Sequence, residues 1–93
     1  TMEWHFIIRF DQKDLHLKAE RIYLSEQVER IKVMGKNRSI VLQSNRPLLR
    51  IKGLKNKRLD WKLIEGQMNN SHVLQAIILK LERLLKTATD LDV

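Results

Sequence analysis

The chain has 93 residues and a mass of 11.1 kDa, which suits a single domain and argues against a two-domain enzyme with an interdomain active site. Hydrophobic residues make up 43% of it, enough for a packed core and too much for a disordered chain. The absence of cysteine excludes disulfides, thiolate zinc sites and a cysteine nucleophile, while the formal net charge of +7 favours anionic partners. We expect one domain over residues 1–93, rich in strands from 3 to 66.

Neither a membrane span nor export is expected. No run of 18 apolar residues occurs, so nothing in the sequence predicts a transmembrane helix. The first residues, Met2-Glu3-Trp4-His5-Phe6, lack the basic region and apolar stretch that are typical of a signal peptide. Together with the lack of cysteine, this pattern favours a cytoplasmic protein.

Two alternating segments open the chain. Their apolar residues fall at every second position and are Trp4, Phe6, Ile8 and Phe10 in the first segment, and Leu15, Leu17 and Ala19 in the second. This period of two predicts half-buried strands. A polar turn at residues 11–14 would close a hairpin that pairs Phe10 with Leu15, Ile8 with Leu17 and Phe6 with Ala19, and this register places apolar residues on one face throughout.

The segment that follows this hairpin is less regular. Ile22 and Leu24 move the apolar positions to even numbers, which predicts a bulge near Glu20–Arg21. Residues 25–30 leave two alternatives open. They form either a short helical turn capped by Ser25 or the beginning of another strand.

A second hairpin is predicted over residues 31–42. A loop at 35–38, which contains Gly35 and Asn37, would set Val33 opposite Ile40 and Ile31 opposite Leu42. Further along, residues 45–47 are typical of a turn, 49–52 alternate like a short strand, and 53–58 form a basic loop. A last strand is expected over 59–66, with Trp61 on its buried face.

The C-terminal part changes to helical periodicity. Apolar residues recur at i, i+3, i+4 and i+7 from Val73 to Leu85, which predicts an amphipathic helix over about residues 71–88, capped by Asn70 or Ser71. Only Leu79 falls in its polar arc. The fold class is therefore α+β: an antiparallel meander of five or six strands followed by one helix, which packs on one sheet face or fills a strongly curved sheet.

Catalytic and metal-binding patterns are missing, so we expect no enzyme activity, no cofactor and no metal. The three histidines, His5, His16 and His72, lack the i, i+2 or i, i+4 spacing that zinc ligands need. No carboxylate pair, glycine-rich phosphate loop or nucleophile motif is present.

The positive charge is concentrated in one segment. Residues 36–62 contain nine bases and one acid, Asp60, whereas the remaining residues contain nine bases and ten acids. A basic surface of this kind attracts polyanions, because neutralising phosphates releases condensed counterions. We therefore expect a small binding protein that contacts DNA or RNA phosphates. The residues expected to make the contacts are Arg38, Arg46, Arg50, Lys52, Lys55, Lys57, Arg58 and Lys62.

An alternative follows from the C-terminal helix. A single helix on a short sheet leaves apolar surface that a second copy of the chain could cover. The protein would then be a homo-oligomeric interaction module, with the homodimer formed through this helix.

Overall fold

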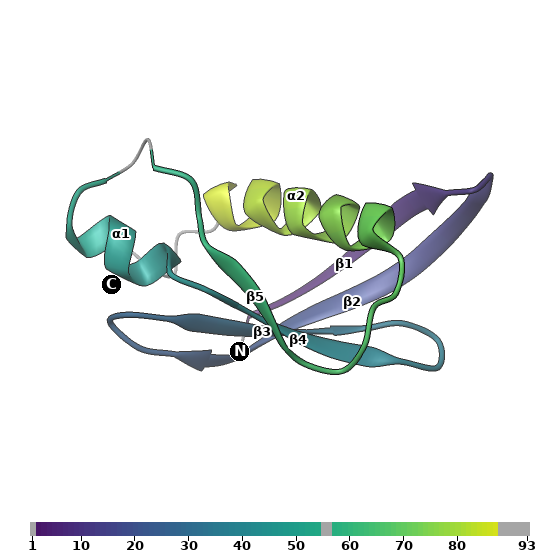
Figure 1. The fold of residues 1–93 in the computed structure, drawn as a ribbon, viewed down its shortest axis with the longest axis horizontal. Helices are drawn as coiled ribbons and strands as arrows, with labels where there is room; N and C mark the ends of the chain where they lie inside the picture. The colour runs from purple at the N-terminus through teal and green to yellow at the C-terminus, as the bar shows by residue number, and fades with distance from the viewer. Residues whose placement is uncertain (1, 55–56, 88–93) are drawn as a thin grey trace.

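The computed structural model describes residues 2–54 and 57–87. The elements are β1 (Glu3–Phe10), β2 (Lys13–Leu24), β3 (Glu29–Met34), β4 (Ser39–Ser44), α1 (Arg46–Ile51), β5 (Trp61–Glu65) and α2 (Ser71–Thr87). The five strands form one antiparallel meander in the order β1-β2-β3-β4-β5. Helix α2 lies across one face of this sheet, and the short helix α1 lies beyond the C-terminal end of α2 (Figure 1). The arrangement confirms the predicted α+β class.

The β1–β2 hairpin forms as expected, but its predicted register is wrong by two residues. Phe10 pairs with Lys13, Ile8 with Leu15 and Phe6 with Leu17. The turn contains just Asp11 and Gln12, whose φ angles of 53° and 61° are both left-handed, as in a type I′ turn. Because a shift of two residues leaves every side chain on its own face, the predicted core face is still the buried one.

The structure shows the bulge in β2 and the conformation of residues 25–30. The register of β2 against β3 shifts between Arg21 and Tyr23, next to the predicted position. The connection between the two strands is a tight turn in which the Ser25 hydroxyl oxygen accepts hydrogen bonds from the N–H groups of Gln27 and Val28 at 3.2 and 3.1 Å. A helix does not form, because Glu29 already begins β3.

The β3–β4 hairpin has the predicted register, with Val33 opposite Ile40 and Ile31 opposite Leu42. The N–H of Gly35 donates to the carbonyl oxygen of Arg38 at 2.8 Å and closes the turn. Strand β5 then pairs with β4 and ends at Glu65, and the next residue, Gly66, has a φ of 85°. A Cβ atom at Gly66 would lie 2.6 Å from the carbonyl oxygen of Ser39, so the chain passes this point only with glycine.

The predicted turn at 45–47 and strand at 49–52 are wrong, since residues 46–51 form helix α1. Pro47 stands in its first turn, where the missing N–H costs no hydrogen bond. Pro47 and Leu49 are buried, whereas Ile51 is 64% exposed. A period of two over four residues is too short to distinguish a strand from one helical turn.

The core lies between the sheet and α2. The apolar stripe of α2 is buried through Val73, Ile77, Leu81 and Leu85, which pack against the inner faces of β1 to β4. Asn70 caps the helix, because its side-chain oxygen accepts from the N–H groups of His72 and Val73 at 2.9 and 3.1 Å. Leu79 stays 59% exposed on the opposite side, as its position in the polar arc predicts.

Candidate functional site

The basic residues centre on the β4–β5 connection, residues 45–60. It leaves the sheet after Ser44 and returns at Trp61, and these two residues are paired across β4 and β5. The side-chain oxygen of Asn45 accepts from the N–H of Asp60 at 2.9 Å and joins the two ends. The two ends of the connection therefore meet at one point on the sheet, and α1 forms its first half.

Two further hydrogen bonds hold this connection against the C-terminal end of α2. Nη1 of Arg46 donates to the carbonyl oxygen of Leu85 at 3.3 Å. At the other end, Nε1 of Trp61 donates to Oε2 of Glu82 at 3.0 Å. The last turns of α2 and the basic connection therefore share one end of the molecule (Figure 1).

Arg46, one of the predicted contact residues, has an internal role. Its Nε and Nη2 atoms each donate to one carboxylate oxygen of Glu29 at 2.9 Å. The side chain of Glu29 is 0% exposed and that of Arg46 is 12% exposed, and Nη1 of Arg21 lies 3.8 Å from the same carboxylate. This ion pair joins α1 to β3, so Arg46 is placed inside the molecule and away from a partner.

Four other predicted residues are exposed on the connection. Arg50, Lys52, Lys57 and Arg58 are exposed, and Asp60 is the one acid in residues 45–60. Lys55 lies outside the described residues. Arg83 and Lys86 are also exposed on the last turns of α2, and Lys86 directly follows the Leu85 that Arg46 contacts.

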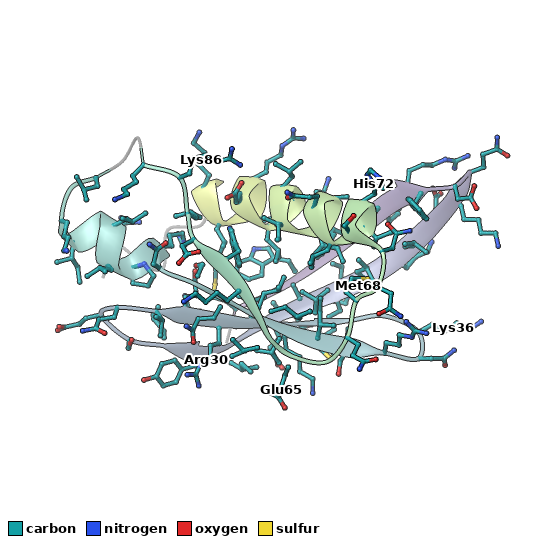
Figure 2. All side chains as sticks on the ribbon, in the orientation of Figure 1. Arg30, Lys36, Glu65, Met68, His72 and Lys86 are labelled. Atoms are coloured by element: carbon teal, nitrogen blue, oxygen red, sulfur yellow. The ribbon has the colours of Figure 1, made fainter. Side chains whose placement is uncertain are left out.

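The remaining predicted residues lie elsewhere. Arg38 is exposed in the β3–β4 turn beside Lys36, and Lys62 is exposed on β5. The molecule is 39 Å long, and Figure 2 shows Lys36 near one end of this axis, whereas Figure 1 shows α1, which carries Arg50, near the other. The bases of residues 36–62 that the structure describes therefore do not form one continuous surface. Sequence reasoning missed Arg83 and Lys86, because their proximity to the connection depends on tertiary hydrogen bonds between distant residues.

Histidine and acidic side chains in the part of the chain that the structure describes lie mostly at the surface. No three histidine or acidic side chains there lie close enough to hold a metal ion. His5 is exposed and contacts Oε1 of Glu3 at 3.2 Å, and Lys18 lies 3.3 Å from the other oxygen. The hydrogen bond from Lys18 is the main cause that lowers the pKa of the Glu3 carboxyl. These groups form a surface charge cluster on β1 and β2.

Comparison of the chain with protein-family models, with curated proteins and with solved structures finds no match. Among residues 2–54 and 57–87, no helix has both the length and the apolar character needed to cross a bilayer. The functional argument therefore depends on the surface itself.

Proposed function

We propose that this protein is a small, non-enzymatic cytoplasmic binding protein that contacts nucleic acid phosphates through the β4–β5 connection. The observation that carries the proposal is the cluster of exposed bases at one end of the molecule. Its members are Arg50, Lys52, Lys57 and Arg58, together with Arg83 and Lys86 on the last turns of α2, which hydrogen bonds of Arg46 and Trp61 join to the connection. Each phosphate neutralised by such a residue releases counterions, so binding gains free energy without any base-specific contact.

The anchoring of the connection supports this function. The hydrogen bonds of Asn45, Arg46 and Trp61 fix both ends of the connection. Because the connection is already held in place, less conformational entropy is lost when it binds a partner. An arginine in the cluster can hold a phosphate with two donors, while a lysine acts as a point charge.

Base stacking contributes little to the proposed contact. Trp61 is half-buried and its indole N–H is bonded to Glu82, so its ring belongs to the packing of β5 on α2. The ring of Tyr23 lies under the guanidinium of Arg30, whose Cζ is 4.9 Å from the ring centroid. We therefore expect little sequence preference and a strong dependence on salt.

A salt titration of binding to a random DNA duplex, followed by fluorescence anisotropy, tests the proposal. If the four exposed bases of the connection each neutralise one phosphate, log K should fall against log[salt] with a slope of about −3.6. The double variant Lys57→Gln/Arg58→Gln should bind more weakly and reduce the slope by about 1.8. Absence of binding by the unmodified chain at low salt would overturn the proposal.

The chain offers a matched control in Lys36→Gln/Arg38→Gln. This variant also removes one lysine and one arginine from an exposed turn, but at the other end of the molecule. It should leave the slope close to that of the unmodified chain. Equal losses in the two variants would show that net charge alone drives binding, and the assignment to the connection would be wrong.

A further inference from the structure

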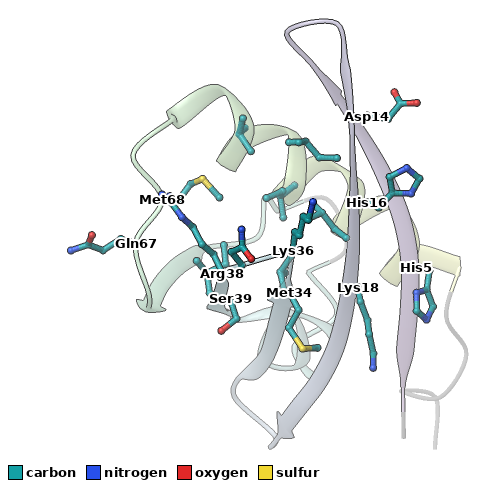
Figure 3. Close-up of a pocket in the computed structure, with 18 residues that line it drawn as sticks. His5, Asp14, His16, Lys18, Met34, Lys36, Arg38, Ser39, Gln67 and Met68 are labelled. Atoms are coloured by element: carbon teal, nitrogen blue, oxygen red, sulfur yellow. The ribbon is translucent and has the colours of Figure 1, made fainter.

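A groove of about 790 Å³ is lined by the beginning of β2, the β3–β4 turn and the beginning of α2. Figure 1 shows the β3–β4 turn at the end of the molecule opposite α1 and the β4–β5 connection. The groove exists because two hairpins diverge. Strand β2 pairs with β1 from Lys13 onward, but with β3 only from Lys18. The groove opens between the first residues of β2, the β3–β4 turn and the beginning of α2 (Figure 3).

The interior of the groove is apolar. Its side chains come from β2, β3, β4, α2 and the connection that precedes α2, and they are Leu15, Leu17, Val33, Ile40, Met68, Val73 and Ile77. The β3–β4 turn comes very close to β2 along the groove, since a Cβ atom on Gly35 would lie 3.3 Å from Cδ2 of Leu17. A volume of this size, lined mainly by apolar groups, is typical of sites for small organic molecules.

The mouth of the groove is positively charged. Lys36 and Arg38 are exposed residues of the β3–β4 turn, and both line the groove. Figure 3 shows their side chains extending from the turn to the same side as Met68. Within the described residues, neither forms an ion pair with a carboxylate.

Other charges around the groove are compensated. Asp14, the acid that lines it, lies with Oδ1 3.0 Å from Nη1 of Arg9. Lys18 lies 3.3 Å from Glu3, which also contacts His5. His16 also lines the groove, but Figure 3 shows its side chain on the side of β2 opposite Lys36 and Met68. The uncompensated charge at the mouth therefore comes from Lys36 and Arg38, and it complements an anion.

We propose that this groove binds a small amphiphilic anion, with its apolar body among the side chains below α2 and its carboxylate at Lys36 and Arg38. A free small molecule fits better than a polyanion, because the lining is mostly apolar and just two cations stand at the mouth. This site is separate from the β4–β5 connection and does not depend on the function proposed for it.

Three ligands that share one alkyl chain test the proposal: decanoate, decanol and decyltrimethylammonium, each used below its aggregation limit. Amide chemical shifts of the ¹⁵N-labelled protein report both the affinity and the location of binding. We expect decanoate to shift residues of the groove, including Gly35 and Leu17, and to bind at least about tenfold more tightly than decanol, as removal of one charge-assisted contact predicts. Decyltrimethylammonium should bind most weakly.

Variants separate the charge at the mouth from the apolar interior. Lys36→Gln/Arg38→Gln should weaken decanoate about tenfold and leave decanol unchanged, whereas Met68→Gln should weaken both. Lys57→Gln/Arg58→Gln, with the same charge change at the other end, should bind decanoate like the unmodified chain. Equal affinity for the three ligands, no saturable decanoate shifts in the groove, or binding restricted to anionic phospholipid vesicles would each overturn the proposal.

Discussion

At the scale of single residues, the carboxylate of Glu29 has the least ordinary environment in the described chain. It is fully buried, and both of its oxygens accept hydrogen bonds from Arg46 at 2.9 Å. Moving a carboxylate out of water costs several kcal/mol, and a bidentate guanidinium compensates this cost through geometry and charge together. The pair therefore fixes where α1 begins relative to β3.

Removal of Arg46 should be severely destabilising. We expect Arg46→Ala to lower the free energy of unfolding by about 3–5 kcal/mol, because it leaves Glu29 buried and largely uncompensated. Urea denaturation measures the change, with Lys57→Ala, an exposed residue of the same connection, expected within about 0.5 kcal/mol of the unmodified chain. A loss below about 1 kcal/mol for Arg46→Ala would contradict this expectation, because the pair would then contribute no more to stability than an ordinary surface ion pair.

The role of Arg46 also shows how far the sequence defines the candidate site. The density of bases in residues 36–62 is visible from composition, and the structure places Arg50, Lys52, Lys57 and Arg58 on the surface as expected. Arg46 looks identical to them in the sequence. Its acidic partner, Glu29, stands 17 positions away. Glu29 belongs to residues 25–30, which the sequence leaves open between a helical turn and a strand, so no local pattern reveals the pair.

At the scale of elements, the β1–β2 turn combines a demanding conformation with residues that do not favour it. Both turn residues have left-handed φ angles, at which glycine and asparagine are the preferred types. The turn has aspartate and glutamine instead. This choice explains why the sequence favoured a longer loop over 11–14, and why the register moved by two while the buried face did not.

Glycine in this turn should stabilise the hairpin. We expect Gln12→Gly to raise the free energy of unfolding by about 1 kcal/mol, the approximate cost of left-handed backbone for an L residue. For a domain of this size that corresponds to an increase in Tm of about 4–8 °C, measurable by calorimetry. Lys13→Gly, one residue later in β2, should instead lose about 0.5–1 kcal/mol. A lower Tm for Gln12→Gly would contradict the type I′ assignment.

Helix α1 is the element that the sequence pattern did not predict. Long periodic segments were assigned correctly from the sequence: the β3–β4 hairpin has its predicted register, and α2 begins at Ser71 as expected. In residues 46–51 the local alternation of Leu49 and Ile51 favoured a strand. Tertiary contacts determined the outcome, because the helix buries Pro47 and Leu49 and directs Arg46 to Glu29.

At the scale of the whole molecule, helix α2 covers one face of the sheet. Ile77, Leu81 and Leu85 are each no more than 1% exposed, so the sheet already occupies the stripe that suggested a homodimer through α2. Such a dimer stays a prediction, and Leu79, at 59% exposure, is the large hydrophobic residue that α2 leaves uncovered. We therefore expect substitutions on the two sides of the helix to change stability by different amounts.

Leu81→Ala and Leu79→Ala make a matched pair two positions apart on α2. We expect Leu81→Ala to lower the free energy of unfolding by about 2–5 kcal/mol, because it leaves a cavity between helix and sheet. Leu79→Ala should change it by less than about 0.5 kcal/mol and leave the mass measured by light scattering unchanged. A drop in mass, or a concentration-dependent loss of stability in Leu79→Ala, would show that a second copy covers the outer side of α2, since the stability of an oligomer depends on protomer concentration.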